Sequence, residues 1–191
     1  MSWLNKKKKF SIETEERGLI ENDDRNNIWL IDPIDGTTNF LHGIPHFCIS
    51  IAFMSYNQII SGVIYDPIKN EMFCAEKDQG AFLNNHRIKV SKKNKLEDCL
   101  FATNKNGIIF SNLNSRVSGS AALDLAYVAN GRFDGYFQKN LNIWDIAAGI
   151  LIVSEAGGKT NEIDNSKISE INVIASSENI SEKMLDKLNK F

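Results

Sequence analysis

Cysteine and proline are scarce in this sequence, which holds three of each among its 191 residues. The cysteines Cys48, Cys74 and Cys99 are odd in number, widely spaced and set in apolar surroundings, which predicts buried free thiols rather than disulfides or a metal site. The longest apolar runs, residues 46–54 and 146–153, are too short to cross a bilayer. The N-terminus lacks the apolar core of a signal peptide, so we expect a cytoplasmic protein without membrane contact.

An excess of charge of one sign is also lacking. The formal net charge is −2 and the sequence pI is about 5.9, which gives no electrostatic footprint for binding nucleic acid. The one basic cluster, Lys6–Lys9, is predicted to be a solvated segment. Hydrophobic residues make up 42% and charged residues 24% of the chain, which is ordinary for a globular protein. Without a repeat or a linker, the chain is predicted to form a single domain over residues 1–191.

The first half of the chain has the pattern of β-strands. Residues 27–31 are a short run of bulky apolar residues before Pro33, which predicts a buried strand. Residues 47–67 contain two apolar segments around the polar "SYNQ", a predicted hairpin. Residues 71–91 continue as short strands around Gly80, so this part of the chain is expected to be an antiparallel meander.

The second half predicts helices. Apolar residues recur at helical spacing from Ala121 to Val128, and "NIWDIAAGILIVSEAGGK" predicts a second, almost wholly apolar helix that must be buried. A strand over residues 171–177 and an amphipathic helix over residues 181–191, capped by Ser181, complete the expected order. The combination indicates the α+β class, with helices layered on a largely antiparallel sheet.

The stretch "WLIDPIDGTTNF" places two carboxylates at the end of an apolar run. Asp32 ends the predicted strand, because Pro33 cannot continue a hydrogen-bonded ladder. Gly36 permits a sharp turn, so Asp32, Asp35 and the Ile34 carbonyl are expected to converge. Such all-oxygen ligands suit a hard cation such as Mg²⁺.

The next residues, "GTTNF", predict the first turn of a helix, whose free N–H groups favour a phosphate. The alternative is that "DPIDG" is only a turn, since Asp, Pro and Gly are common turn residues. Further carboxylates come from Asp145, at the start of a buried helix, and from Glu15 and Glu16, upstream of the strand. Taken singly, Asp145 is explained as a negative charge at the N-terminal end of a helix dipole, and Glu15 and Glu16 are explained as a solvated acidic stretch. Together they could close a site for several metal ions.

Five segments carry a resemblance to a known family. "WLIDPIDGTTNF" and "WDIAAGILIVSEAGG" resemble the paired signature of the inositol monophosphatase family, and "LHGIPHFCISIAF", "GVIYDPIKNEMFCAEKDQGAFLNN" and "GSAALDLAYVANGRFDGY" are similar to it as well, particularly to its bacterial SuhB-type branch. The similarity runs from about Glu13 to the C-terminus. It implies a layered α/β sandwich of the sugar phosphatase type.

The resemblance also implies a site for two or three Mg²⁺ ions. The implied metal ligands are Glu15, Asp32, Ile34, Asp35 and Asp145. The residues implied to contact the substrate are Ile34, Gly36, Thr37, Gly119, Ser120, Ala121, Gln138 and Asp145. The implied catalytic residues are Glu15, Asp35 and Thr37, whose hydroxyl would orient the attacking water.

The implied activity is the hydrolysis of inositol monophosphate, or of a related sugar or polyol phosphate, by a water that Mg²⁺ makes more acidic. No covalent phosphoenzyme is needed, and the histidines His42, His46 and His86 are expected to be structural. Family membership further implies sensitivity to lithium.

Three features depart from the family pattern. Only fourteen residues precede Glu15, where family members normally carry two long helices, so we expect a chain shortened at its N-terminus. The segment "NKNGIIFSNLNSRV" replaces a longer stretch, which indicates internal shortening. Gln138 stands where the family often has a glutamate that binds a substrate hydroxyl.

These departures leave two classes of function open. The favoured one is a Mg²⁺-dependent phosphomonoesterase. Its competitor is a binding protein that keeps the fold but is catalytically impaired and serves transcription or ribosome assembly, as SuhB-type relatives do. A different substrate, fructose bisphosphate or a phosphoadenosine nucleotide, is disfavoured by the short chain. The resemblance also implies that a homodimer is common in such proteins.

Overall fold

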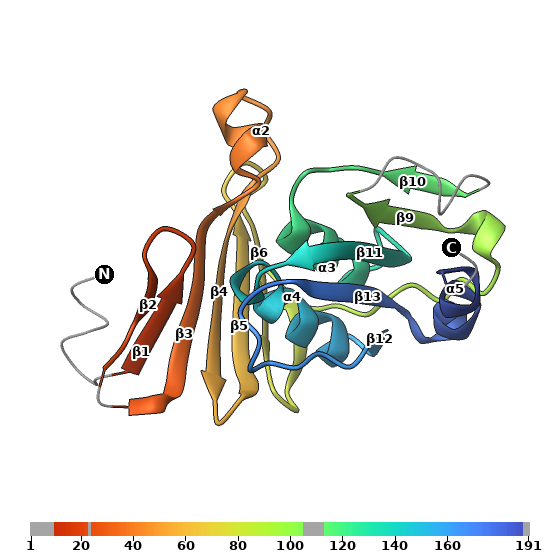
Figure 1. Ribbon diagram of the computed structural model, residues 1–191. Coiled ribbons are helices and arrows are strands. Elements are labelled where there is room, and N and C mark those ends of the chain that lie inside the picture. The colour runs from red at the N-terminus through yellow and green to blue at the C-terminus, as the bar shows by residue number, and fades with distance from the viewer. Residues whose placement is uncertain (1–9, 23, 105–112, 189–191) are drawn as a thin grey trace.

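The computed structural model describes residues 10–22, 24–104 and 113–188, which form two β-sheets with helices between and beside them (Figure 1). The larger sheet has eight strands in the order β2-β1-β3-β4-β5-β6-β7-β8. β1 pairs with β3 in parallel, and the other neighbours are antiparallel. Its strands are β1 (Phe10–Thr14), β2 (Gly18–Ile20), β3 (Asp24–Asp35), β4 (Cys48–Ser55), β5 (Gln58–Asp66), β6 (Glu71–Glu76), β7 (Gly80–Leu83) and β8 (His86–Arg87).

The smaller sheet has five strands in the order β10-β9-β11-β13-β12. β9 pairs in parallel with both of its neighbours, and β13 pairs antiparallel with β11 and β12. Its strands are β9 (Leu100–Thr103), β10 (Asn114–Arg116), β11 (Gly135–Leu141), β12 (Gly158–Thr160) and β13 (Ile171–Ser177).

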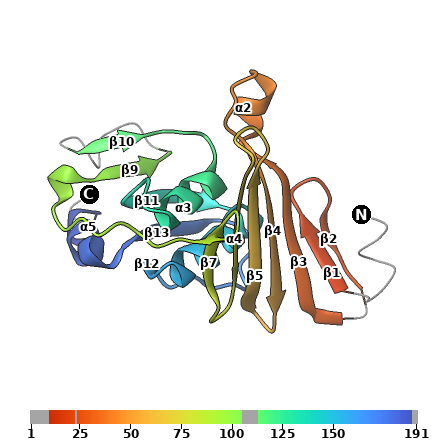
Figure 2. The ribbon, with the colours of Figure 1, turned by 180° about the vertical axis from the view of Figure 1, so that it is seen from behind.

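Four α-helices lie in the described residues: α2 (Thr37–Leu41), α3 (Ala121–Ala129), α4 (Ile143–Glu155) and α5 (Ser181–Leu188). Short 3₁₀ turns, η1 (Leu96–Asp98) and η2 (Glu178–Ile180), precede β9 and α5. α3 and α4 fill the space between the two sheets, and α5 packs on β13 at the far side of the smaller sheet (Figures 1 and 2). The result is a sheet, helix, sheet, helix arrangement.

The main core lies between the sheets, where α3 and α4 are buried on nearly every side. α4 lies so close to β5 that a Cβ at Gly62 would be 2.8 Å from the Cα of Ala148. This spacing explains why the helix is apolar around its whole circumference, since none of its central turns is free to face water. A second cluster, which includes Phe101, Phe137 and Met184, joins the smaller sheet to α5.

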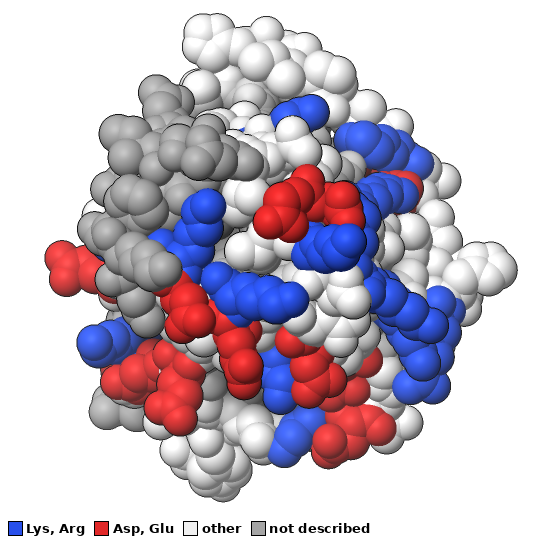
Figure 3. Space-filling model, turned by 90° about the vertical axis from the view of Figure 1, so that its right-hand side faces the viewer, with Lys and Arg blue, Asp and Glu red and all other residues white. Residues whose placement is uncertain are grey.

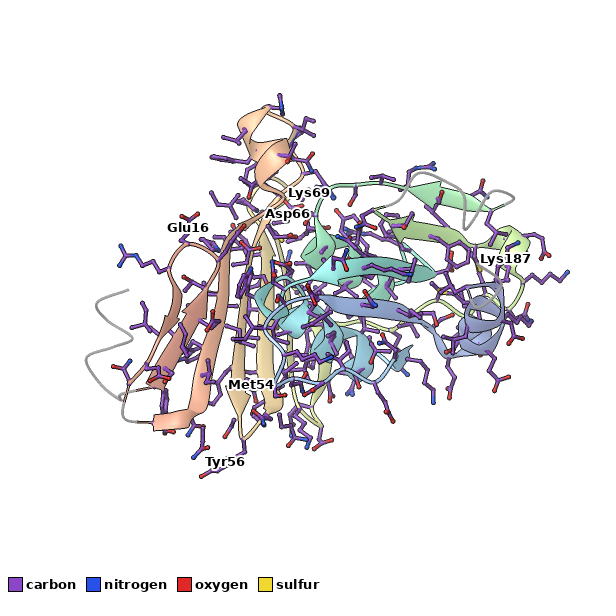
Figure 4. All side chains as sticks on the ribbon, in the orientation of Figure 1. Glu16, Met54, Tyr56, Asp66, Lys69 and Lys187 are labelled. Carbon is purple, nitrogen blue, oxygen red and sulfur yellow. The ribbon has the colours of Figure 1, made fainter. Side chains whose placement is uncertain are left out.

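The α+β class and most of the expected elements are confirmed. The meander runs from β4 to β8, and Tyr56 and Asn57 take positive φ angles at the tip of the first hairpin, where Figure 4 labels Tyr56. α3 and α4 begin and end close to their predicted bounds, and β13 covers the predicted strand. Asp66 ends β5 and pairs with Lys69 below α2, as Figure 4 also shows.

Three expectations about elements need correction. The strand predicted for residues 27–31 is longer, because β3 runs through Pro33 to Asp35. Ser181 does not cap the last helix from outside: it has helical dihedral angles and is the first residue of α5. The single predicted sheet is two, since the parallel pairings of β1 and β9 were not visible as local patterns.

The three cysteines are free, as predicted, although Cys74 is only half-buried. None of the helices in the described ranges has the length and apolar character needed to span a membrane. On the face that holds the smaller sheet, acidic and basic side chains are interspersed (Figure 3). The Lys6–Lys9 cluster, most of the shortened segment (residues 105–112) and residues 189–191 of the last predicted helix lie outside the described residues.

Candidate active site

A cleft of about 290 Å³ opens where the ends of several elements meet. The turn after β1, the end of β3 and the first residues of α2, α3 and α4 all reach it. The lining residues are Glu15, Asp32, Ile34, Asp35, Gly36, Thr37, Thr38, Thr103, Asn104, Val117, Gly119, Ala121, Asp124, Gln138, Leu141, Asn142 and Asp145. Of the site residues predicted from the sequence, only Ser120 is not among them. Glu16, the neighbour of Glu15, lies on the turn between β1 and β2 (Figure 4).

A β-bulge at the end of β3 aims two carboxylates in the same direction. Asp32 pairs with Ser50 of β4 and Asp35 pairs with Cys48, so three steps along β3 match two along β4. Without the extra residue, side chains three apart on a strand would point to opposite faces of the sheet. Pro33, which has no N–H to donate, is accommodated within this irregular segment. The bulge is therefore what brings Asp32 and Asp35 into one cleft.

Asp32 is held by its own turn. Its Oδ1 accepts a hydrogen bond from the Ile34 N–H at 2.9 Å, and its side chain is buried. The Thr37 hydroxyl donates to the Ile34 carbonyl at 3.0 Å. The loop from Asp32 to Thr37 is thus closed by two internal hydrogen bonds, which fix the carbonyl and the carboxylate beside each other.

Asp35 is held by α3, which comes from a distant part of the sequence. Its Oδ2 accepts hydrogen bonds from the Ser120 hydroxyl and from the Ala122 N–H at 2.9 Å, and the Cys48 thiol lies 3.7 Å away. The Ser120 oxygen also accepts from the Leu123 N–H at 3.3 Å, as an N-cap does. Ser120 is 2% exposed, so its side chain supports Asp35 instead of lining the cleft.

The start of α2 requires glycine at position 36. Gly36 has φ 95°, and a Cβ there would lie 3.1 Å from the His46 carbonyl oxygen and 3.3 Å from that of Gly119. Asn39 braces the same region, because its Nδ2 donates to the carbonyls of His46 and Ser118. The backbone near Gly36 is therefore locked against the segment before α3.

Asp145 has two roles in the geometry. It lies in the first turn of α4, where its Oδ2 accepts a hydrogen bond from the Asn142 N–H at 2.9 Å, which closes the helix start. Asp145 therefore has the position in the first turn of α4 where its charge favours the helix dipole, and its side chain also lines the cleft. Helix capping and a place in the site are compatible, because the carboxylate has two oxygens.

The carboxylates of the cleft repel one another. Burial, and then the charge of Asp35, raises the pKa of Asp32 to about 8, despite its hydrogen bond from Ile34. Burial raises the pKa of Asp145 to about 7, with the charges of Asp35 and Glu15 acting in the same direction. The pKa of Asp35 is also raised by burial, against the opposing effect of its hydrogen bonds. A cation among these groups would remove the repulsion.

The chemistry of this donor set fits Mg²⁺. The oxygen ligands are carboxylates from three elements and one backbone carbonyl, and no nitrogen or sulfur ligand is among the described lining residues. Within residues 10–22, 24–104 and 113–188, no three acidic, histidine or cysteine side chains already converge as a metal-ligand cluster. The case for Mg²⁺ therefore rests on the oxygen chemistry of these ligands and on their lining the same cleft.

The opposite wall of the cleft is polar. The Tyr136 hydroxyl donates to the Oε1 of Gln138 at 2.8 Å, which leaves the amide NH₂ of Gln138 to face a ligand. Asp124, which is 2% exposed, accepts a hydrogen bond from the Ser118 hydroxyl at 2.6 Å. Burial, and then the charge of Asp35, raises the pKa of Asp124 well above its usual range. The Gln138 amide NH₂ supplies a hydrogen-bond donor to this wall, and the Asp124 carboxyl adds a second polar group.

Sequence reasoning missed Asp124 as a lining residue, along with Thr38, Thr103, Asn104, Val117, Leu141 and Asn142. Asp124 did give a signal, because it is the single charged residue in an otherwise apolar helix. No histidine is among the described residues that line the cleft.

Comparisons with known proteins point to one family. The chain matches the model of the Inositol monophosphatase family over residues 4–190. It is 43% identical over 195 residues to Nus factor SuhB of Haemophilus influenzae, which covers 93% of this chain and 73% of that protein. It is 39% identical over 197 residues to an inositol-1-monophosphatase of Caulobacter vibrioides, with 91% and 76% covered.

A solved structure agrees with these matches. The crystal structure of extragenic suppressor protein suhB from Bartonella henselae superposes with a TM-score of 0.91 at 44% identity. The superposition covers 99% of this chain and 80% of that one. Nearly all of this chain is thus matched, while a part of each relative has no counterpart in it.

Proposed function

This chain belongs to the inositol monophosphatase family, and on that premise we propose that it hydrolyses a small phosphomonoester in the presence of Mg²⁺. The substrate class is inositol monophosphate or a related sugar or polyol phosphate. The observation that carries the proposal is that Glu15, Asp32, Asp35 and Asp145 all line one cleft beside the first turns of three helices.

The metal ligands would be the four carboxylates and the Ile34 carbonyl, enough for two or three ions. Bound Mg²⁺ would supply a more acidic water and neutralise charge on the phosphate and on the leaving oxygen. The Asp32 turn and the start of α3 fix the positions of Asp32 and Asp35 before any ion arrives, and the carboxylates would draw together around the ion on binding.

The phosphate would lie at the start of α2. Gly36 and Thr37 line the cleft there, and their backbone N–H groups are the donors that a phosphate oxygen needs. The Thr37 hydroxyl donates to Ile34, so its oxygen remains an acceptor. That oxygen can accept a hydrogen bond from the attacking water and orient it, with Asp35 and Glu15 completing the catalytic set.

The polyol would face the opposite wall. Gly119 and Ala121 line the cleft beside the phosphate region, and Gln138 and Asp124 offer polar groups to ring hydroxyls. Asp145 lies where it can contact both metal and substrate. We infer that Ser120 acts through Asp35, although the sequence had placed it among the substrate contacts.

A second candidate function rests on the name of a relative. The Haemophilus influenzae protein is a Nus factor, so this chain is a candidate for a role in transcription or ribosome assembly as a binding protein. A homodimer and a cytoplasmic location are also part of the proposal. Three free thiols suit a reducing compartment.

One experiment separates the two functions. Phosphate release from inositol 1-phosphate and a panel of sugar phosphates would be measured with and without Mg²⁺, for the purified chain and for Asp35→Asn. We expect Mg²⁺-dependent release that Asp35→Asn abolishes. A folded chain that releases no phosphate from any ester would contradict the enzyme and favour the binding role. Lithium inhibition would then test a further property that the resemblance implies.

A further inference from the structure

We propose that a pocket at the C-terminal end of α4 binds the phosphate group of a small phosphorylated molecule. The pocket measures about 300 Å³. It is separate from the cleft described above, because Asp145 of the cleft lies in the first turn of α4 and Glu155 of the pocket is its last residue. Ten residues of helix at about 1.5 Å each place these two about 15 Å apart. The inference is independent of the proposed hydrolysis.

One wall of the pocket is the chain that joins the two sheets. This chain follows β8 and leads to η1 and β9, so it crosses from the larger sheet to the smaller one (Figure 2). Its residues 87–92 line the pocket, and the other lining residues are Glu155, Ala156, Gly157, Glu178 and Asn179. The sequence of this wall, "RIKVSKK", is a second basic cluster besides Lys6–Lys9.

The backbone of this wall is held by hydrogen bonds. The Val90 N–H donates to the Ala156 carbonyl at 3.2 Å. Across the pocket, Nδ2 of Asn179 donates to the Lys92 carbonyl at 3.0 Å. Ile88 and Val90 also pack against the main core. The wall is therefore in place before a ligand arrives, which lowers the entropy cost of binding.

Arg87 is directed by its neighbours. Ile88 packs against the core, so Arg87 and Lys89 on either side of it point the other way, and both are exposed. A Cβ at Gly80 would lie 2.5 Å from Nη2 of Arg87, so the guanidinium passes over a position that glycine leaves open. Its Cζ lies 6.0 Å from the centre of the Phe82 ring. The planar guanidinium is thus supported from below and presents its N–H groups beside the pocket.

The cations of the pocket have no counter-charge. Within the part of the chain that the structure describes, Arg87, Lys89 and Lys92 form no ion pair. The next residue, Lys93, behaves differently, because it pairs with the buried Asp134 at 2.9 Å. Three positive charges around one pocket repel one another, and an anion among them would remove this repulsion.

The acids of the pocket are already engaged. Both oxygens of Glu155 accept backbone N–H groups, from Asp78 at 2.8 Å and from Gly80 at 2.7 Å. Glu178 pairs with Lys159 at 3.3 Å. The dipole of α4 favours cations at this end of the helix, but such an effect is typically only about 0.3 to 1 kcal/mol and does not account for three of them. The excess positive charge therefore faces the pocket.

A phosphate monoester matches these groups. It carries about −1.5 to −2 charges at pH 7 and three acceptor oxygens. The fork of Arg87 suits two of these oxygens, and the ammonium groups of Lys89 and Lys92 suit the third. The Ser91 hydroxyl accepts the Lys93 N–H at 3.2 Å, so its own proton can be donated to the ligand. The volume lies at the lower end of the range of ligand sites, about 300 to 1,000 Å³, which favours a small molecule.

NMR of the ¹⁵N-labelled chain in EDTA would locate the binding, with inorganic phosphate and AMP as probes. EDTA keeps Mg²⁺ out of the cleft, so phosphate finds no metal there. We expect the amide signals of Ser91, Gly157 and Asn179 to move as either probe is added, while those of Thr37 and Gly119 in the cleft stay in place. Tighter binding of AMP would support a nucleotide as the ligand, and equal binding would support recognition of the phosphate group alone.

Two substitutions at Arg87 test the cause of the binding. Arg87→Gln removes a charged hydrogen-bonding group, so the Kd for AMP should rise about tenfold. Arg87→Lys keeps the charge without the fork and should have a smaller effect. Lys167→Gln is the matched control, because Lys167 is exposed and lies on the loop that contacts the other end of α4, and it should leave the Kd unchanged. The amide spectrum itself shows whether each variant folds.

Three results would overturn the proposal. These are the absence of amide shifts at millimolar phosphate and AMP, shifts confined to the cleft, and a Kd that changes as much in Lys167→Gln as in Arg87→Gln. Phosphate release in Mg²⁺ should be the same in Arg87→Gln and in the wild-type chain. Failure of this pocket and failure of the proposed phosphatase are therefore seen in different measurements.

Discussion

The Ser120 hydroxyl donates a hydrogen bond to Oδ2 of Asp35 across 85 residues of sequence. The same Oδ2 accepts the Ala122 N–H, so one oxygen of the carboxylate is saturated by the start of α3. Oδ1 is then the oxygen that can take a cation. A hydroxyl that fixes a metal ligand in this way acts on the metal without touching it.

Ser120→Ala should weaken Mg²⁺ binding. Removing the hydroxyl frees Asp35 and also deletes the cap on Leu123, and such supporting groups typically change metal affinity or activity by about 10- to 100-fold. We expect the Mg²⁺ concentration for half-maximal phosphate release to rise about tenfold, and Ser120→Thr to keep near-normal behaviour. The Mg²⁺-induced rise in Tm should fall in parallel. An unchanged Mg²⁺ dependence in Ser120→Ala would show that the bond to Asp35 has no role in metal binding.

Tyr136→Phe should alter substrate recognition more than turnover. Without the hydroxyl, the Gln138 amide is no longer held with its NH₂ toward the cleft. We expect KM for a polyol phosphate to rise several-fold with kcat little changed, since only binding to the ring is lost. p-Nitrophenyl phosphate, which has no ring hydroxyls, is the control substrate and should show an unchanged KM. Equal effects on both substrates would contradict this role.

The free energy of unfolding of the metal-free chain should fall as the pH rises, because Asp32 and Asp145 have raised pKa values. The pKa of Asp32 is raised to about 8 and that of Asp145 to about 7, so the folded state holds these protons more tightly than the unfolded state. Their contribution is fully present below about pH 4 and is lost as the pH rises through 7 to 8. Mg²⁺ competes with the same protons. The gain in Tm from Mg²⁺ over EDTA should therefore grow between about pH 6 and pH 9, and a gain that is constant with pH would contradict the prediction.

Gly149→Ala should destabilise the fold. A Cβ at this position would lie 2.6 Å from the Cβ of Leu125, so α3 and α4 would have to separate. Overpacking of this kind costs about 1 to 3 kcal/mol. Ser154→Ala, on the exposed side of the same helix, is the control and should be close to neutral. Urea unfolding of both variants measures the difference. A Gly149→Ala midpoint equal to that of the control would show that the two helices are not in such close contact.

Local patterns were enough to predict some of the fold. α3 and α4 carry helical periodicity with clear ends, and the β4 to β8 meander joins neighbours in sequence through short turns. β1 and β11 were not predicted, because each is paired with at least one strand that is distant in sequence or parallel to it. Such pairings leave no short-range signal.

The sequence predicted most of the carboxylates that line the cleft, but not the contacts that hold them in place. The spacing of Asp32 and Asp35 indicated convergence, but the reason given was a strand that ends at Pro33, whereas the structure achieves it with a bulge inside β3. Ser120 was expected to contact substrate, since a motif gives the residue but not its side-chain direction. Asp124 was not singled out, because the helix around it is otherwise apolar and was interpreted as a core helix.

The most direct measurement is the rate of phosphate release from inositol 1-phosphate as Mg²⁺ is titrated into the chain from EDTA to millimolar concentrations. If the carboxylates of the cleft hold the ions that activate water, the rate should rise from zero and saturate with Mg²⁺, and Asp35→Asn should stay at zero. Release that is equally fast in EDTA, or no release from a folded chain at any Mg²⁺ concentration, would contradict the proposed phosphatase site.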